Sequence, residues 1–289
     1  MTKTFGQVSA VKDLTFTVEP GQVTGFLGPN GAGKTTSLRM LLGLVRPTSG
    51  DATFGGTAYA KLDSPLETVG ASLEAASFHP GRSARNHLAV YAQAAGLAKT
   101  TPDAALEKVG LSAYGDRRVG GYSLGMRQRL GLAFALLGDP GVLVLDEPIN
   151  GLDPEGIKWI RLLLRSMAAE GRTVLISSHL LSEVQQTVDE VIIISHGTLV
   201  HRGELSSLDT SDTKQVQVNA DDRDRLSAVL VEAGYQVSNL RSGVLVENAE
   251  ASAVGRLAFE AGIPVTALSQ KRTGLEESFL SLVGEEGAL

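Results

Sequence analysis

The sequence contains no cysteine, which excludes disulfide frameworks, thiolate metal sites and cysteine nucleophiles. It also lacks an excess of positive charge, because the formal net charge at pH 7 is −6. Without a global positive field a protein has little electrostatic attraction for nucleic acid, so we expect no nucleic-acid partner. The absence of cysteine is compatible with a reducing compartment, and we predict a cytoplasmic location.

Long apolar runs are missing as well, including the amino-terminal stretch that is typical of a secretory signal. The most apolar segments, residues 130–138 and 142–145, are much shorter than the roughly 20 residues that cross a bilayer as a helix. If the protein acts on a membrane, we therefore expect another chain to span it.

The chain is longer than a single hydrophobic core usually is, since it has 289 residues, and this length favours two domains. In residues 1–204, short apolar runs at 23–27, 142–145 and 173–177 predict buried parallel strands. The amphipathic segment 155–169 predicts a crossover helix, and residues from about 80 to 137 predict a mostly helical insert. The expected fold class of this part is α/β.

A Ser- and Asp-rich stretch at 205–213 marks the expected boundary of a smaller domain, residues 205–289. Four strands are predicted there, at 214–219, 235–240, 243–248 and 264–268. Helices are predicted at 221–233, at 250–261 and from about 274. This order suggests an α+β domain of the split βαβ, ferredoxin-like type.

The strand at 23–27 runs into a segment that matches GxxxxGK[ST] and precedes a helix. In that context the glycines let backbone N–H groups and the helix N-terminus face phosphate oxygens. We expect Lys34 to neutralise the β- and γ-phosphates and the Thr35 hydroxyl to ligate Mg²⁺. The predicted nucleotide-binding residues are Gly28, Pro29, Asn30, Gly31, Ala32, Gly33, Lys34, Thr35 and Thr36.

Two carboxylates, Asp146 and Glu147, follow the apolar strand 142–145 at the sheet edge where open α/β sheets bind ligands. Asp146 is expected to hold Mg²⁺, directly or through water. Glu147 is then placed to orient, or accept a proton from, the water that attacks the γ-phosphate. Taken alone, such a strand end is more often just a solvated edge, and the phosphate loop favours the functional interpretation.

A further segment, residues 122–129, has the sequence YSLGMRQR and precedes an apolar helix. With the two preceding motifs it resembles the signature of ABC ATPases, whose consensus is LSGGQ. Leu124 replaces the first glycine and Met126 the glutamine, whereas Ser123 and Gly125 are kept. Ser123 and Gly125 can offer a hydroxyl and N–H groups to an anion at the helix N-terminus. By itself, Ser123 is typical of a helix N-cap.

The resemblance covers residues 1–204 and implies further roles. Phe5 matches an aromatic residue that stacks on adenine, although an isolated phenylalanine is more often part of a core. Asp153 matches a residue that communicates across a dimer and also suits a helix N-cap before Pro154. His179 matches a histidine that contacts the γ-phosphate. Glu74 takes the place of a glutamine that links Mg²⁺ and water to the membrane partner.

The family implies an ATPase with the cofactors ATP and Mg²⁺ that works as a homodimer on a separate integral membrane permease. The protein would then lie at the inner face of the cell membrane, bound through that permease. A family-typical strand before Lys3 is not found, which means either a lost edge strand or a start that lies upstream. The segment 273–280 resembles the terminal helix of drug-resistance exporter subunits, and it equally suits a helix that caps a small domain.

These observations predict ATP-driven export of a drug-like or hydrophobic compound. Import or lipid transfer is an alternative within the family, because nothing in the sequence identifies cargo. A soluble ABC ATPase acting on DNA or ribosomes is a third possibility. The acidic composition and the absence of a basic arm or long coiled coil count against it.

Overall fold

The computed structural model describes the chain except residues 74–77, 209–213, 241–242, 273–274 and 285–289. It divides into two compact units. Among the described residues, the first unit comprises those in 1–205 and 282–284, and the second comprises those in 206–281.

A six-stranded sheet forms the centre of the first unit, in the order β4-β5-β6-β3-β7-β8. Its strands are β3 (Val23–Leu27), β4 (Val69–Ser72), β5 (Val142–Leu145), β6 (Thr173–Ser178), β7 (Glu190–Ser195) and β8 (Thr198–Glu204). All neighbours are parallel except β7 and β8. Every residue of β3 is buried, which explains why its sequence VTGFL contains no charged residue. The α/β core predicted from sequence is confirmed.

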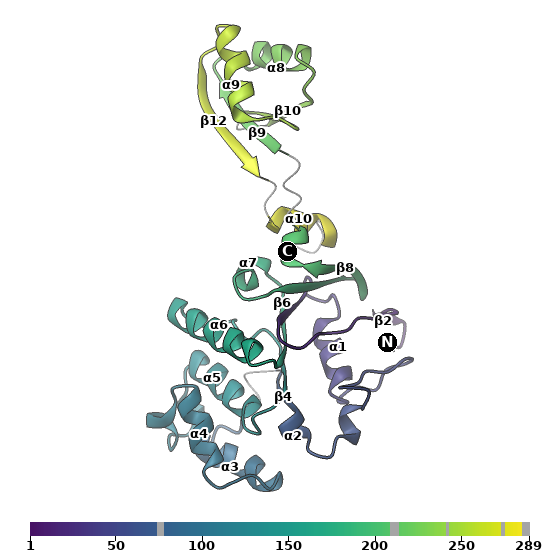
Figure 1. Cartoon of the computed structure of the whole chain (residues 1–289), viewed down its shortest axis with the longest axis vertical. Coiled ribbons are helices and arrows are strands. Elements are labelled where there is room, and N and C mark those ends of the chain that lie inside the picture. Colours follow the sequence, from purple (N-terminus) through teal and green to yellow (C-terminus); the bar gives the residue numbers. More distant parts are fainter. Residues whose placement is uncertain (74–77, 209–213, 241–242, 273–274, 285–289) are drawn as a thin grey trace. The chain divides into compact units, whose positions relative to one another are not determined.

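Helices lie on both sides of this sheet, with α1 on one side and α6 on the other (Figure 1). The helices of the unit are α1 (Lys34–Leu41), α2 (Pro65–Thr68), α3 (Ala84–Ala94), α4 (Thr101–Lys108), α5 (Leu124–Ala135), α6 (Pro154–Ala169) and α7 (Leu181–Val184). Single 3₁₀ turns occur at Tyr59–Lys61, Ser112–Tyr114, Val119–Gly121 and Leu205–Leu208. The apolar residues of α6 recur at helical spacing, and Ile160, Leu164 and Met167 are buried.

The expected helical insert is present and contains α3, α4 and α5, which gather at one side of the unit (Figure 1). We refer to these three helices as the helical lobe. α5 also lies directly against β4, because an added Cβ at Gly70 would fall 1.9 Å from the carbonyl oxygen of Ala135. The helical lobe therefore packs against β4, the edge strand whose last residue lies next to Asp146.

The amino-terminal segment forms a hairpin of β1 (Lys3–Phe5) and β2 (Val8–Val11). Phe5 therefore ends a strand, whereas we expected it ahead of the first strand. Thr2 N–H donates to the Ser49 carbonyl at 2.9 Å, and Leu14 N–H donates to the Met1 carbonyl at the same distance. The backbone of Met1 is thus bonded to Leu14, and that of Thr2 is bonded to Ser49.

In the second unit, four antiparallel strands are ordered β10-β11-β9-β12, which is the arrangement of a split βαβ domain. The elements are β9 (Lys214–Ala220), α8 (Arg223–Glu232), β10 (Val237–Leu240), β11 (Gly243–Val246), α9 (Ala251–Glu260) and β12 (Val265–Arg272). α10 (Leu275–Val283) follows. Alternate residues of β9, including Val216 and Val218, pack in one core with Leu226 of α8 and Val254 of α9. This unit has its own hydrophobic core.

Candidate active site

The loop between β3 and α1 places its glycines where the backbone has no room for a side chain. An added Cβ at Gly28 would lie 2.3 Å from the carbonyl oxygen of Ile194, and one at Gly33 would lie 2.5 Å from that of Ala10. Gly33 also has a φ of 104°, in the region that favours glycine. These residues let the loop turn tightly into α1, and Ala32 is buried beneath it. Such a loop directs N–H groups at an anion.

Lys34 is buried at the start of α1, with 6% of its side chain exposed. Its Nζ donates to the carbonyl oxygens of Gly28 at 2.6 Å and Pro29 at 3.2 Å. Burial lowers the pKa of the Lys34 ammonium, while the nearby charges of Glu147 and Asp146 oppose that shift. The ammonium is therefore held at the rim of the loop in an environment that favours pairing with an anion.

Thr35 and Asp146 meet where α1 begins and β5 has just ended. The Thr35 hydroxyl donates to Asp146 Oδ2 at 2.8 Å. The other carboxylate oxygen accepts a hydrogen bond from the Ser177 hydroxyl. The two predicted Mg²⁺ ligands thus lie together and offer hard oxygen donors of the kind this cation prefers.

Glu147 follows directly and has a left-handed backbone, with a φ of 49°. Its N–H donates to the Ser177 hydroxyl at 3.0 Å, which fixes this unusual conformation. The carboxylate accepts from His179 Nδ1 at 3.0 Å and lies 3.9 Å from Lys34 Nζ. Burial raises the pKa of the Glu147 carboxyl, although His179 and Lys34 oppose the shift. A carboxylate whose pKa is raised binds a proton more readily, so Glu147 is suited to accept one.

The signature segment begins α5. Ser123 is the N-cap, and its hydroxyl accepts from the Met126 N–H at 3.2 Å. Among the described residues no hydrogen bond or ion pair joins Ser123 to the phosphate loop of the same chain. Asp153 likewise caps α6 by accepting from the Gly156 N–H at 3.0 Å. The two capping roles that we considered are thus present in the structure.

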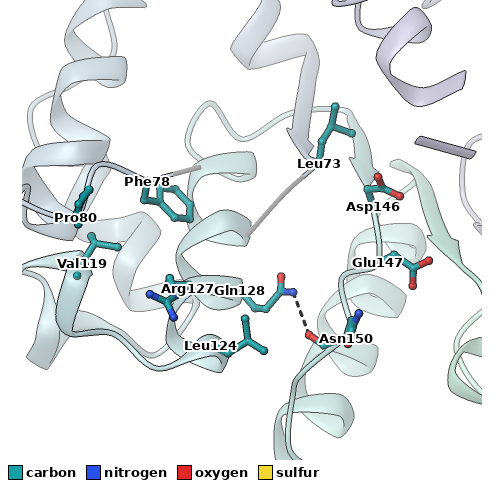
Figure 2. Close-up of a pocket in the computed structure, with 11 residues that line it drawn as sticks. Leu73, Phe78, Pro80, Val119, Leu124, Arg127, Gln128, Asp146, Glu147 and Asn150 are labelled. Carbon is teal, nitrogen blue, oxygen red and sulfur yellow. Dashed lines mark hydrogen bonds between the residues drawn. The ribbon is translucent and has the colours of Figure 1, made fainter. Parts of the chain in front are cut away.

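A cavity of about 660 Å³ lies between the carboxylate edge of the sheet and α5. Figure 2 shows Asp146, Glu147 and Asn150 on one side and Leu124 with Gln128 on the other. The cavity gives Glu147 access to a water molecule or ligand from the direction of the helical lobe.

The structure also places the predicted residues Phe5, Asn30, Gly31 and Thr36. The Phe5 side chain is half exposed, and the ammonium of Lys3 lies 4.7 Å from the centre of its ring. It is not part of the core. Glu74 falls outside the described residues. Asn30 and Gly31 lie at the exposed tip of the phosphate loop, and Thr36 continues α1.

Our sequence reasoning missed Ser177, whose hydroxyl contacts both Asp146 and the backbone of Glu147. The available signal was a polar residue at the end of an apolar strand, at the same sheet edge as the carboxylates. It also missed Gln128, whose side-chain amide reaches the carbonyl oxygen of Asn150.

Comparisons with known proteins bear on this arrangement. The family described as "ABC transporter" matches residues 11–150, and a family described as "domain of unknown function" matches residues 214–276. The chain is 39% identical to the bacitracin transport ATP-binding protein BcrA of Bacillus licheniformis, over 98% of this chain and 95% of that protein. It is 38% identical to the lantibiotic transport ATP-binding protein SrtF of Streptococcus pyogenes, over 68% of this chain and 86% of that protein.

Solved structures resemble the larger part of this chain. An ATP-binding subunit of an ABC transporter is 25% identical with a TM-score of 0.65, over 72% of this chain and 88% of that one. A dimeric, post-hydrolysis ATP-binding cassette bound to ADP and Pi has a TM-score of 0.63 and 20% identity, over 70% of this chain and 94% of that one. The second likeness concerns the fold alone.

Proposed function

Because the chain belongs to the ABC transporter family and is an ATP-hydrolysing subunit of it, we propose that it powers export of an antibiotic-like compound. The observation that supports this most directly is its similarity to a bacitracin transport protein over nearly the whole of both chains. None of the described helices is long and apolar enough to cross a membrane. Because the relatives are named as ATP-binding proteins of transport systems, we assign the pathway for the cargo to a separate permease at the cell membrane.

We propose that two copies enclose two ATP molecules, each between one copy's phosphate loop and the other copy's signature segment. The absence of an internal contact between Ser123 and the phosphate loop among described residues is compatible with this. In each site the loop N–H groups and Lys34 hold the phosphates. Glu147 orients the attacking water and accepts its proton, and His179 holds the Glu147 carboxylate through their hydrogen bond.

Mg²⁺ fits the pair Thr35 and Asp146, since their oxygens already lie 2.8 Å apart. Within the described residues, no group of three or more His, Asp or Glu side chains is arranged so that it could hold a metal ion by itself. A protein site for Mg²⁺ commonly needs only one or two such side chains, because phosphate and water supply the other ligands. When bound, the cation neutralises charge on the phosphate oxygens. We keep Glu74 as a third candidate ligand on sequence grounds.

For the permease, we propose docking at a groove of about 350 Å³ between the first unit's sheet and its helical lobe. Apolar and aromatic side chains line it, including Leu44, Tyr59, Phe78, Tyr91 and Phe134. Leu44 is 66% exposed and Tyr91 is 39% exposed. A short apolar helix of the permease suits such a groove.

The test is resistance and transport. Cells that express this chain with its permease should tolerate a higher concentration of a bacitracin-like peptide, and Lys34→Ala should abolish that protection. Purified complex in vesicles should move the labelled peptide only with Mg·ATP. The cargo assignment would be refuted if ATPase activity were robust but the complex neither protected cells against any peptide tested nor transported it.

A further inference from the structure

The signature helix α5 and the turn that follows Glu147 are far apart in the sequence but joined in the structure. Gln128 Nε2 donates to the carbonyl oxygen of Asn150 at 3.0 Å, as Figure 2 shows. Asn150 in turn donates its N–H to the Glu147 carbonyl at 3.2 Å and so closes the turn. The amide of Gln128 is therefore one hydrogen bond removed from the backbone of the proposed catalytic base.

A second contact involves Leu124, at the position where the family consensus has glycine. An added Cβ at Gly151 would lie 2.3 Å from Leu124 Cδ2, so the leucine packs directly on that glycine's backbone. Leu152 lies across from Gly125, with its Cδ2 3.7 Å from an added Cβ. The departure from consensus thus adds apolar contact between α5 and the turn.

Further along α5, Arg129 joins two more elements. Its guanidinium lies 4.6 Å from the centre of the Trp159 ring in α6, within the range of a cation–π interaction. Its Nη1 also donates to the carbonyl oxygen of Val109 at 3.2 Å, just after α4. Beyond the turn itself, α5 is therefore tied to α6, the helix that Asp153 caps.

We propose that Gln128 is a positioning residue for hydrolysis: it fixes the turn from Glu147 to Asp153 relative to the signature segment at Ser123. The elements that reach into two different nucleotide sites then move together. Phosphate-loop residues make no hydrogen bond with Gln128 within the described part of the chain. Loss of the Gln128 contact should therefore slow hydrolysis without weakening nucleotide binding.

The proposal rests on ATP hydrolysis and not on the identity of the cargo. Its test uses three variants of the full chain, Gln128→Ala, Gln128→Glu and Gln128→Lys. Glutamate keeps the shape of glutamine but has no N–H donor when ionised, whereas lysine restores a donor. Gln93→Ala is the matched control, because Gln93 is exposed on α3 in the same lobe.

We expect kcat for Mg·ATP hydrolysis to fall by about 2- to 12-fold in Gln128→Ala, the range for losing one hydrogen bond. Gln128→Glu should fall at least as far, Gln128→Lys should recover part of the rate, and Gln93→Ala should match the parent. KM and the affinity for a fluorescent ATP analogue should stay within about twofold of the parent. These quantities change when an interaction is lost that holds the nucleotide in the ground state, and Gln128 makes no such interaction in the proposal.

Parental kcat in Gln128→Glu would overturn the proposal, because the donor would then be unnecessary. It would also be overturned if kcat and nucleotide affinity fell together, since that pattern indicates a general loss of structure. If peptide transport fails while these rate ratios hold, only the proposed cargo is wrong.

Discussion

Replacing Glu147 by glutamine tests the centre of the proposed mechanism. Glutamine keeps an oxygen that can accept a hydrogen bond from His179, which now lies 3.0 Å from the carboxylate. The phosphate loop and Lys34 are unchanged, so ATP binding should be intact. Loss of a general base typically costs about 10²- to 10⁴-fold, and we expect kcat to fall within that range. The Glu147→Gln variant should accumulate as a dimer with ATP bound.

The same substitution should not destabilise the folded protein. Burial raises the pKa of the Glu147 carboxyl, so the folded state favours the protonated, uncharged form. A raised pKa contributes stability at pH values below the unfolded pKa, and that contribution is lost as the pH rises through the folded pKa. Above the folded pKa, the uncharged glutamine should therefore give a melting temperature equal to or above that of the parent. The difference should vanish in acid.

Activity of the parent should respond to pH in a related way. As the pH falls, Glu147 takes up its proton at a higher pH than an ordinary glutamate does, and the base is lost. On the acid side of the pH profile, kcat should therefore fall with an apparent pKa above that of an ordinary glutamate.

Phosphate release at saturating Mg·ATP measures the rate, and size-exclusion chromatography with ATP detects the dimer. Glu107→Gln is a matched control, since Glu107 is exposed on α4. An ATPase rate of Glu147→Gln within about threefold of the parent would refute the role of Glu147, because base loss costs far more. A large fall in melting temperature would instead indicate that the carboxylate is structural.

Further variants test the shared nucleotide site, Glu74 and Ser177. Mixing inactive Lys34→Ala with inactive Ser123→Arg should restore partial ATPase activity, because one composite site per heterodimer is intact; no recovery despite detectable heterodimer would contradict shared sites. For the proposed role of Glu74 near Mg²⁺, we expect Glu74→Gln to keep ATPase activity and to lower the Mg²⁺ concentration for half-maximal rate, because the substitution would remove a negative charge from the position that this role assigns beside the triphosphate. Glu74→Ala should impair permease-coupled transport more than basal hydrolysis, and parental behaviour in both assays would make Glu74 a solvated loop residue. Ser177→Ala should lower kcat by up to about tenfold, because the Glu147 N–H loses its acceptor; an unchanged rate would show that the left-handed turn does not need it.

The sequence alone determined the local parts of this protein. A buried strand, a glycine-rich turn and a helix are consecutive in residues 23–41, so the phosphate loop is specified by neighbours in the chain. The same holds for Asp146 and Glu147, which must emerge where their apolar strand ends. The helix caps Ser123 and Asp153 were equally readable, because a cap contacts backbone only a few residues away.

Only the tertiary structure decided which distant groups touch. Ser177 reaches Asp146 because β5 and β6 are adjacent, and strand adjacency depends on the packing of the whole sheet. The bond from Gln128 to Asn150 depends on how α5 lies against the sheet edge, which no spacing in the sequence encodes. The direction of the Glu147 pKa shift also required the fold, because desolvation is set by every neighbour that excludes water and not by the residue type.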